Sequence, residues 1–380
     1  MTLLSTLLFS LMSLIMGTSQ EADILFAGDA MQHQGQLDAA RRAVGVYDYT
    51  GCFDAVSPYV RVADYAVVNL ETPLGYRNFS GYPCFNAPVS YAKALRDAGF
   101  DLMLTANNHC LDRRDAGVIN TLTLLDSMNV PHVGTYRNAA ERHRRLPFIV
   151  DINGFRTAFL NYTYGTNGIG IQRDIVVDYI DRDLMARDVA AARQAGAEII
   201  AACIHWGNEY QLLPHISQTR LADYLTDLGV DLIIGSHPHV IQPMEMRHSD
   251  RHDKDVLLVY SLGNFISNMK TRDTRGGAMV RVTLYRDSLG TARVKSPTYH
   301  LVFTIPPTGR HTNYRLLPAE SVTDTTHAVP TIWQSRCADF TRAAQSIFTR
   351  HNRNVPRDTT RLQTRRPISS SAIPTGNLTH

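Results

Sequence analysis

The chain has 380 residues, which suffice for one large α/β domain or two domains of ordinary size. Its 38 basic and 35 acidic residues nearly balance, so we do not expect nucleic acid as a partner. The five cysteines show no C-x-x-C spacing, which argues against a zinc site built from thiolates. Cys52 and Cys84 lie in loop-like sequence, and in an exported protein they either form a disulfide or remain free thiols.

The N-terminal residues have the pattern of a secretory signal peptide. Residues 1–16 are almost entirely Leu, Met, Ile, Phe, Ser and Thr, and small residues follow at the expected cleavage positions. The segment is too short for a membrane anchor, so we predict a signal peptide over 1–19. We therefore expect an exported protein that is periplasmic, attached to the cell surface or secreted.

Short apolar runs that end in polar residues recur along the chain, and each run is typical of a buried strand. In chain order, the runs and their terminal polar residues are 23–28 with Asp29, 64–70 with Asn69 and Glu71, 101–106 with Asn108, His109 and Asp112, 198–204 with His205, and 230–234 with His237 and His239.

Helical patterns separate these strands, which predicts an α/β fold with a largely parallel sheet. A pair of strands around Asn153-Gly154 predicts a hairpin with a type I′ turn. The predicted helices cover 118–128, 181–196 and 217–228; a further strand covers 255–260, and hairpin strands are added at 147–164 and 277–305.

The domain organisation is predicted as one main domain over 20–305, followed by an extension over 306–350. The extension contains an amphipathic helix, because apolar residues between 330 and 350 recur at helical spacing. Residues 351–380 carry five arginines and one acid among Ser, Thr and Pro, so we expect a basic, flexible tail.

The polar residues at the strand ends are expected to meet, because α/β folds gather such ends into one crevice. Carboxylate oxygens and imidazole nitrogens together suit divalent ions such as Mn²⁺, Zn²⁺ or Fe²⁺. Two such ions lower the pKa of a bound water and neutralise charge on a reacting group, which favours hydrolysis of a phosphate ester.

The motifs that carry these residues resemble those of CapA-type poly-γ-glutamate capsule synthesis proteins. The resemblance covers about residues 23–268. It rests on Gly28-Asp29-Ala30-Met31, Asn69-Leu70-Glu71-Thr72-Pro73, Ala106-Asn107-Asn108-His109 with Asp112, His205-Trp206-Gly207-Asn208-Glu209-Tyr210, Gly235-Ser236-His237-Pro238-His239-Val240 and Tyr260-Ser261-Leu262-Gly263-Asn264-Phe265. That family is related to the calcineurin-like metallophosphatases, which implies a four-layer α/β/β/α sandwich, here with a C-terminal extension, and a site for two divalent metals.

The resemblance also implies roles for individual residues. The implied metal ligands are Asp29 and His239 for the first metal, Glu71 as the bridge, and Asn108, His205 and His237 for the second metal. The implied general acid is His109, which Asp112 orients. Four residues lie near the metal loops and are expected to line a substrate groove, with core packing as the alternative for the two aromatic ones: Asn69, Trp206, Tyr210 and Asn264.

Two departures from the phosphatase pattern concern the first metal. Met31 stands where the phosphatases have a histidine, and a thioether is a poor ligand for hard divalent ions. Glu71 is longer than the bridging Asp of the phosphatases. We therefore expect the first metal to be weakly held or absent, and we interpret nearby His33 as an ordinary loop histidine.

The predicted function is capsule polymer biosynthesis by an exported, metal-dependent hydrolase that attacks a phosphoester or related bond with activated water. One alternative is a non-catalytic factor that binds or assembles the polymer on the same fold. Another alternative is a hydrolase or transferase acting on γ-glutamyl amides. The expected partners are an anionic extracellular polymer or a phosphoester substrate, together with membrane-bound capsule synthesis machinery.

Overall fold

The computed structural model describes residues 20–309, 311–319 and 328–358. The predicted signal peptide, residues 1–19, and the last part of the predicted tail, residues 359–380, lie outside this range. In the described part of the chain, no helix is both long enough and apolar enough to cross a membrane.

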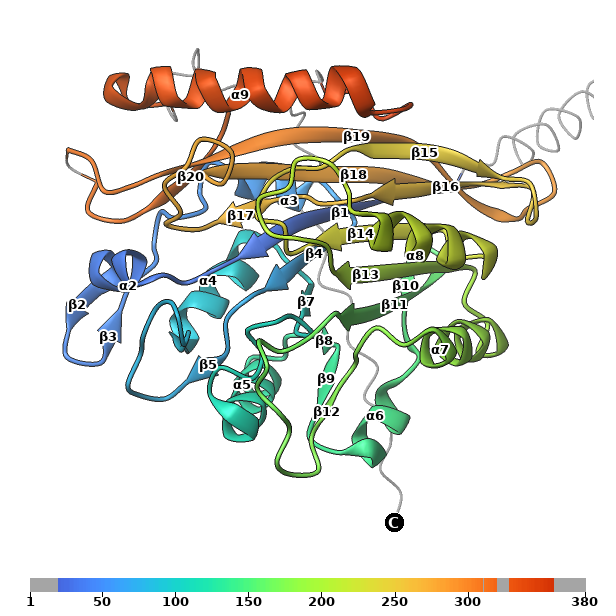
Figure 1. The fold of residues 1–380 in the computed structure, drawn as a ribbon, viewed down its shortest axis with the longest axis horizontal. Helices are drawn as coiled ribbons and strands as arrows, with labels where there is room; N and C mark the ends of the chain where they lie inside the picture. The colour runs from blue at the N-terminus through green and yellow to red at the C-terminus, as the bar shows by residue number, and fades with distance from the viewer. Residues whose placement is uncertain (1–19, 310, 320–327, 359–380) are drawn as a thin grey trace, which may run out of the picture.

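Two large sheets form the centre of the molecule (Figure 1). The strands of the eight-stranded sheet are, in spatial order, β20 (Arg315–Pro318), β19 (Ala292–Ile305), β18 (Gly276–Arg286), β1 (Glu21–Ala30), β4 (Tyr65–Leu70), β7 (Leu102–Leu104) and β8 (His132–Val133), with β17 (Asn264–Ile266) also paired to β1. The strands of the six-stranded sheet are β10 (Phe148–Ile152), β11 (Phe155–Thr163), β13 (Ile199–His205), β14 (Leu232–Ser236), β16 (Lys254–Val259) and β15 (Met244–Ser249).

The pairing directions agree with the sequence pattern. β1, β4, β7 and β8 are parallel, as are β11, β13, β14 and β16. Helices connect these strands, except that β14 leads to β16 through a loop and β15. The predicted hairpins are β10–β11 and β18–β19, both antiparallel. Asn153 and Gly154 have φ angles of 51° and 85°, as a type I′ turn requires.

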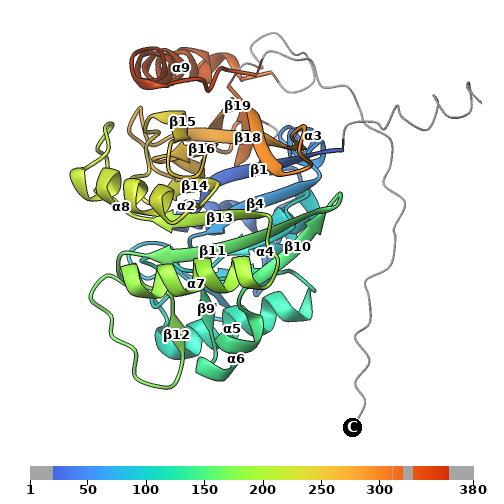
Figure 2. The ribbon, with the colours of Figure 1, turned by 90° about the vertical axis from the view of Figure 1, so that its right-hand side faces the viewer.

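The two sheets pack face to face and helices cover both outer faces, so the predicted four-layer α/β/β/α sandwich is confirmed (Figure 2). Between the sheets, the ring of Phe159 on β11 lies 5.3 Å from Tyr65 on β4 and 6.4 Å from Phe26 on β1. The eight-stranded sheet is covered by α3 (Ser57–Arg61), α4 (Val89–Ala98) and α5 (Arg114–Ser127), and the six-stranded sheet by α7 (Arg182–Gln194) and α8 (Ile216–Asp227).

Smaller elements decorate the sandwich. They are α2 (Gln34–Ala40), α6 (Ala139–Arg145) and three two-stranded pairs, β2 (Arg41–Ala43) with β3 (Val46–Tyr47), β5 (Leu74–Gly75) with β6 (Ala87–Pro88), and β9 (Thr135–Tyr136) with β12 (Val176–Val177). Cys52 is a buried free thiol and Cys84 is an exposed free thiol. Of the two alternatives expected for these cysteines, the structure therefore shows free thiols and not a disulfide.

The C-terminal extension packs onto the sandwich through α9 (Thr331–His351), which lies over β19 in Figure 1. Its buried stripe includes Phe340, whose ring lies 5.7 Å from Phe303. Residues 352–358, which the sequence pattern assigned to the flexible tail, pack as well: Arg353 bridges to β15 and Arg357 to β19. Backbone hydrogen bonds to strands hold this segment, and composition alone does not reveal such contacts.

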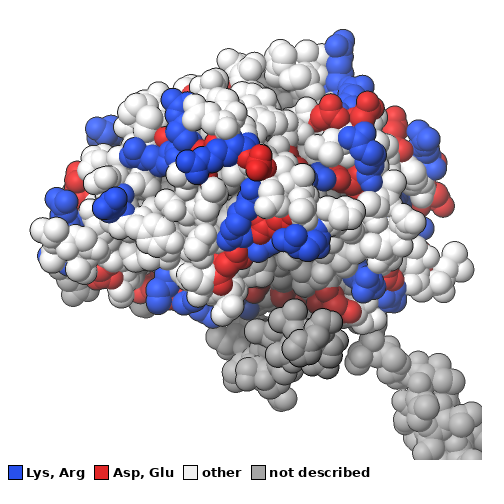
Figure 3. Space-filling view, turned by 90° about the horizontal axis from the view of Figure 1, so that it is seen from below, with Lys and Arg blue, Asp and Glu red and all other residues white. Residues whose placement is uncertain are grey.

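The outer face drawn in Figure 3 carries Lys and Arg side chains interspersed with Asp and Glu. This mixture agrees with the near balance of basic and acidic residues in the chain. No broad field of one sign covers the part of that face that the structure describes.

Removing the Phe159 ring is expected to destabilise the contact between the two sheets. Phe159→Ala should lower the free energy of unfolding by about 3–5 kcal/mol, because the cavity left between Phe26 and Tyr65 cannot fill. Urea unfolding followed by circular dichroism measures the change. Phe159→Leu should lose less, and equal losses for the two variants would contradict this packing.

Candidate metal centre

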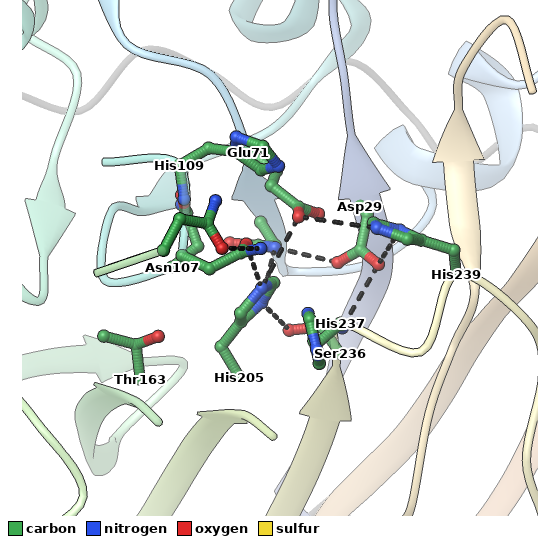
Figure 4. Close-up of polar contacts among 12 residues, drawn as sticks. Asp29, Glu71, Asn107, His109, Thr163, His205, Ser236, His237 and His239 are labelled. Atoms are coloured by element: carbon green, nitrogen blue, oxygen red, sulfur yellow. Dashed lines mark hydrogen bonds and ion pairs between the residues drawn. The ribbon is translucent and has the colours of Figure 1, made fainter. Parts of the chain in front are cut away.

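The carboxyl ends of five parallel strands meet where the two sheets face each other (Figure 4). The residues predicted at these ends all come together there and are buried. They are Asp29 on β1, Asn69 on β4 with Glu71 just after it, Asn108 and His109 after β7, His205 on β13, and His237 and His239 after β14.

Glycines permit this close approach of strand ends. A Cβ on Gly28 would lie 2.0 Å from the carbonyl oxygen of Gly263, and a Cβ on Gly235 would lie 2.0 Å from that of Tyr260. Both distances are far below van der Waals contact, so only glycine fits at these two positions. The parallel pairing of β1 with β4 then sets Asp29 beside Asn69.

Two carboxylates lie side by side in this seam, and one of them is unsatisfied. Asp29 accepts hydrogen bonds from the Asn69 amide at 2.8 Å and from the backbone N–H of His237 at 3.2 Å. Neither carboxylate oxygen of Glu71 has a hydrogen-bond partner, although both are buried. Burial, followed by the charge of Asp29, raises the pKa of Glu71 well above its usual value.

Three imidazoles surround the carboxylates. His205 Nε2 lies 2.9 Å from Asn108 Oδ1 and 3.5 Å from Glu71 Oε1. His239 Nδ1 lies 3.3 Å from Asp29 Oδ2, and its Nε2 lies 3.8 Å from Glu71 Oε1. His237 Nδ1 is buried without a hydrogen-bond partner.

Two of these histidines are held in the neutral form. Burial, with the neighbouring histidines adding to it, lowers the pKa of His237 to about 2 and that of His205 well below its usual value. A neutral imidazole keeps a nitrogen lone pair for a metal ion, so this electrostatic setting suits metal ligands.

The loop after β14 adopts a backbone that non-glycine residues rarely take. His237 has φ = 98° and His239 has φ = 57°, both in the left-handed region. Each such residue costs about 1–3 kcal/mol and persists only where surrounding contacts enforce it. The strained loop places the His239 ring beside Asp29 and Glu71, and the His237 ring beside His205 (Figure 4).

Within the described part of the chain, three groups of side chains offer ligand atoms that lie within 4.8 Å of one another. The first group is Glu71 with His205 and His237, and the second is Asp29 with Glu71 and His239. Glu71 belongs to both, which is the arrangement a bridging carboxylate needs. The third group joins Glu209 to His237 and His239. Glu209 lies in a predicted motif, but its sequence position alone did not mark it as a ligand.

His109 is held by a carboxylate at the edge of the centre. Its Nδ1 lies 2.9 Å from Asp112 Oδ2, which also accepts the backbone N–H of Phe85 at 2.8 Å. The Phe85 ring packs edge-on against the imidazole at 4.6 Å. These contacts fix the orientation of the His109 ring.

The residues predicted to line a substrate groove separate into three kinds. Asn69 and Asn264 are buried and hold site residues: the Asn264 side-chain oxygen lies 3.1 Å from His239 Nδ1. Trp206 is buried in the core beneath α8, and its indole N–H donates to the Tyr260 carbonyl at 2.9 Å, so the prediction that it lines the groove is wrong. Tyr210 is exposed, with its ring 6.2 Å from that of His239.

A tyrosine that the sequence did not mark also borders the centre. Tyr164 follows β11, is half-exposed, and has its ring 4.5 Å from that of His237. No local motif surrounds it, and only the pairing of β11 with β13 brings it beside His205.

Met31 and His33 serve the structure around the site. Met31 is buried, and its backbone carbonyl accepts from the Tyr91 hydroxyl at 3.0 Å. His33 Nδ1 accepts the backbone N–H of Asn268 at 3.3 Å, and its ring packs against Phe85. His33 therefore has structural contacts of its own, in line with the loop histidine that we expected.

The buried neutral histidines predict an acid-sensitive apoprotein. As the pH falls below 6.5, the usual histidine pKa, His237 binds a proton in the unfolded chain but stays neutral in the folded chain. The free energy of unfolding should then fall by about 1.4 kcal/mol per pH unit for each such histidine, and Glu71, whose pKa is raised in the folded chain, opposes this fall by binding a proton there. Urea unfolding in chelator at about pH 7 and about pH 5 measures this slope. A His205→Gln/His237→Gln variant should show a shallower slope, and an identical one would contradict the assignment.

The chain is similar to known capsule synthesis proteins. Residues 23–269 match the model of the family described as bacterial capsule synthesis protein PGA_cap. The capsule biosynthesis protein CapA of Bacillus anthracis is 28% identical over 287 residues, covering 72% of this chain and 66% of that protein. The PGA biosynthesis protein CapA of Bacillus subtilis (strain 168) is 27% identical over 285 residues, covering 72% of this chain and 71% of that protein.

Two solved structures are similar more distantly. The NAD nucleotidase of Haemophilus influenzae has a TM-score of 0.46 and 12% identity, covering 85% of this chain and 62% of that one. The 5′-nucleotidase of Candida albicans SC5314 has a TM-score of 0.38 and 12% identity, covering 86% and 58%. Because these scores are low, the fold assignment rests on the sheet topology described above. The family match covers well over half of the chain, and the chain therefore belongs to the bacterial capsule synthesis protein family PGA_cap.

Proposed function

We propose that this protein is an exported, metal-dependent hydrolase that acts in the synthesis, release or anchoring of an anionic capsule polymer. The observation that carries the proposal concerns Glu71, which lies between His205 and His239. Both of its carboxylate oxygens are buried and lack hydrogen bonds. A buried carboxylate without donors is costly unless a cation compensates it. The bond that the enzyme hydrolyses is a phosphoester or a related bond.

The residues present fit two divalent cations, such as Mn²⁺, Zn²⁺ or Fe²⁺. One cation would be held by Asp29 and His239 and the other by His205, His237 and Asn108, with Glu71 shared between them. When bound, the cations would supply a water of lowered pKa and would neutralise charge on the substrate. Glu209 adds a carboxylate near His237 and His239, on the side where Met31 adds no hard ligand.

The chain itself supplies the proton for the leaving group. Asp112 accepts from His109 Nδ1, so the ring is fixed with Nε2 free to carry the transferable proton. His109 donates this proton to the leaving-group oxygen as the bond to it breaks. Exposed Tyr210 and half-exposed Tyr164 flank the centre and orient the substrate against it.

A second function, binding or assembly of the polymer without turnover, is favoured by one observation. Met31 is buried where a hard ligand is expected, so it adds no metal ligand to the Asp29 side of the centre. For this second function, the centre would hold a cation that binds anionic groups of the polymer without cleaving it. A membrane-bound synthesis complex is the partner we propose for either function.

Metal binding is expected to depend on the strained histidine loop. His237→Ala should weaken binding of Mn²⁺ or Zn²⁺ at least about tenfold, because it removes one of the ligands of the second cation. Isothermal titration calorimetry on chelator-treated protein measures the affinity. His143→Ala, which changes an exposed histidine on α6, should leave it unchanged. An equal affinity in wild type and His237→Ala would contradict the assignment of this loop as a ligand loop.

Turnover is expected to depend on His109 in a way that reveals its role. His109→Gln should lower kcat by about 10²–10⁴ for an alkyl phosphodiester, and much less for a nitrophenyl ester whose leaving group needs no proton. Metal content should not change, because His109 belongs to none of the candidate ligand groups.

The same assays distinguish the candidate functions. Hydrolysis of the phosphodiester supports the proposal, whereas cleavage of poly-γ-glutamate alone would favour an amide hydrolase or transferase. A metal-loaded protein that cleaves neither substrate but binds the polymer would overturn the proposal in favour of the binding factor. Equal losses on the alkyl and nitrophenyl esters would contradict the acid role of His109.

A further inference from the structure

A basic cavity of about 550 Å³ lies between the loop 267–275 and α9, outside the metal centre. Cavities of this size hold small ligands or a short stretch of a polymer. Its charged lining residues are Lys270, Arg272, Arg275, Arg336 and Arg342, with Asp339 as the acid among them.

Most of this positive charge is not compensated by the protein. Arg272 pairs with Asp273, and Arg342 pairs with Asp339. Lys270, Arg275 and Arg336 form no ion pair with any residue in the described ranges of the chain. The cavity therefore keeps an excess of cations, in contrast to the mixed charges on the face in Figure 3.

Arg275 makes this excess costly, because its side chain is buried. Only 8% of the residue is exposed, and its guanidinium donates one hydrogen bond, at 3.3 Å, to the carbonyl of Lys270. The guanidinium carbons of Arg275 and Arg336 each lie 4.9 Å from the centre of the Trp333 ring. Both guanidinium groups therefore pack against the same indole. Burial, with the charge of Arg336 adding to it, lowers the pKa of Arg275. A bound anion would relieve this desolvated, unpaired charge.

We propose that this cavity binds carboxylate groups of an acidic polymer chain, as a second site beside the metal centre. The polymer is the anionic capsule polymer of the proposed function, on which this choice of ligand rests. The cations stand on two separate elements, the loop and the helix, so the cavity offers several positive charges to one acidic chain. Arginine forks bind carboxylates through paired hydrogen bonds, which suits Arg275 and Arg336.

The loop 267–275 connects the cavity to the metal centre. The Asn264 amide donates to the carbonyl of Thr274 at 2.8 Å, directly before Arg275. The side-chain oxygen of the same Asn264 lies 3.1 Å from His239 Nδ1. One asparagine therefore contacts the cavity loop and a candidate metal ligand, so a polymer segment held in the cavity would lie against the loop that supports His239.

The test compares binding of a fluorescent γ-linked glutamate decamer to matched charge variants of the full-length protein. Lys270→Glu/Arg336→Glu changes two exposed residues of the cavity and should weaken binding at least about tenfold. Arg144→Glu/Arg350→Glu makes the same change in net charge at exposed positions outside the cavity and should change the affinity less than about twofold. Circular dichroism verifies that each variant is folded.

The outcomes distinguish binding in this cavity from binding at the metal centre, and a polymer ligand from a single small anion. Binding that persists in His237→Ala supports a separate site even if the hydrolase proposal fails. Equal weakening by both double variants would overturn the proposal, because it would reflect net charge alone. Inorganic phosphate or a glutamate dimer that binds as tightly as the decamer would also overturn it, in favour of a site for single anions.

Discussion

The burial of Asp29 and Glu71 in one seam between the sheets is the constraint on which the site depends. Two carboxylates in such a place cannot both stay ionised on their own. Either a cation compensates their charge, or one of them binds a proton. Two of the surrounding histidines do not supply the charge, since burial keeps His205 and His237 neutral. The protein therefore builds a cluster of acceptors, which a proton on Glu71 or a bound cation would stabilise.

The scaffold accepts local strain to keep these acceptors together. Gly28 and Gly235 allow strands to approach a neighbouring backbone more closely than any side chain permits. The next loop then holds His237 and His239 in left-handed conformations that are unfavourable on their own. Strain of this kind is retained where the surrounding sheets over-determine the backbone, and here they do so at the position where the chemistry is proposed.

Much of the fold and the site could be predicted because each candidate residue lies at the end of a recognisable apolar strand. The parallel order of strands brings such ends together, so Asp29 and His205 could be expected to meet although they lie far apart in the chain. Trp206 could not be placed correctly, because one residue of offset on a strand turns a side chain from the site into the core. Glu209 and Tyr164 were missed because only tertiary packing brings them to the histidines.

The segment after α9 has a consequence for the solubility of the protein. β15 is the last strand of the six-stranded sheet, and the Met246 N–H donates to the Arg353 carbonyl at 2.9 Å while the Arg353 N–H donates to the Met244 carbonyl at 3.0 Å. These bonds occupy an edge that would otherwise offer free backbone groups to another chain. Residues 352 and 353 thus cover this part of the sheet edge, and a chain shortened to end at α9 would expose the backbone groups of Met244 and Met246 to pairing with another chain.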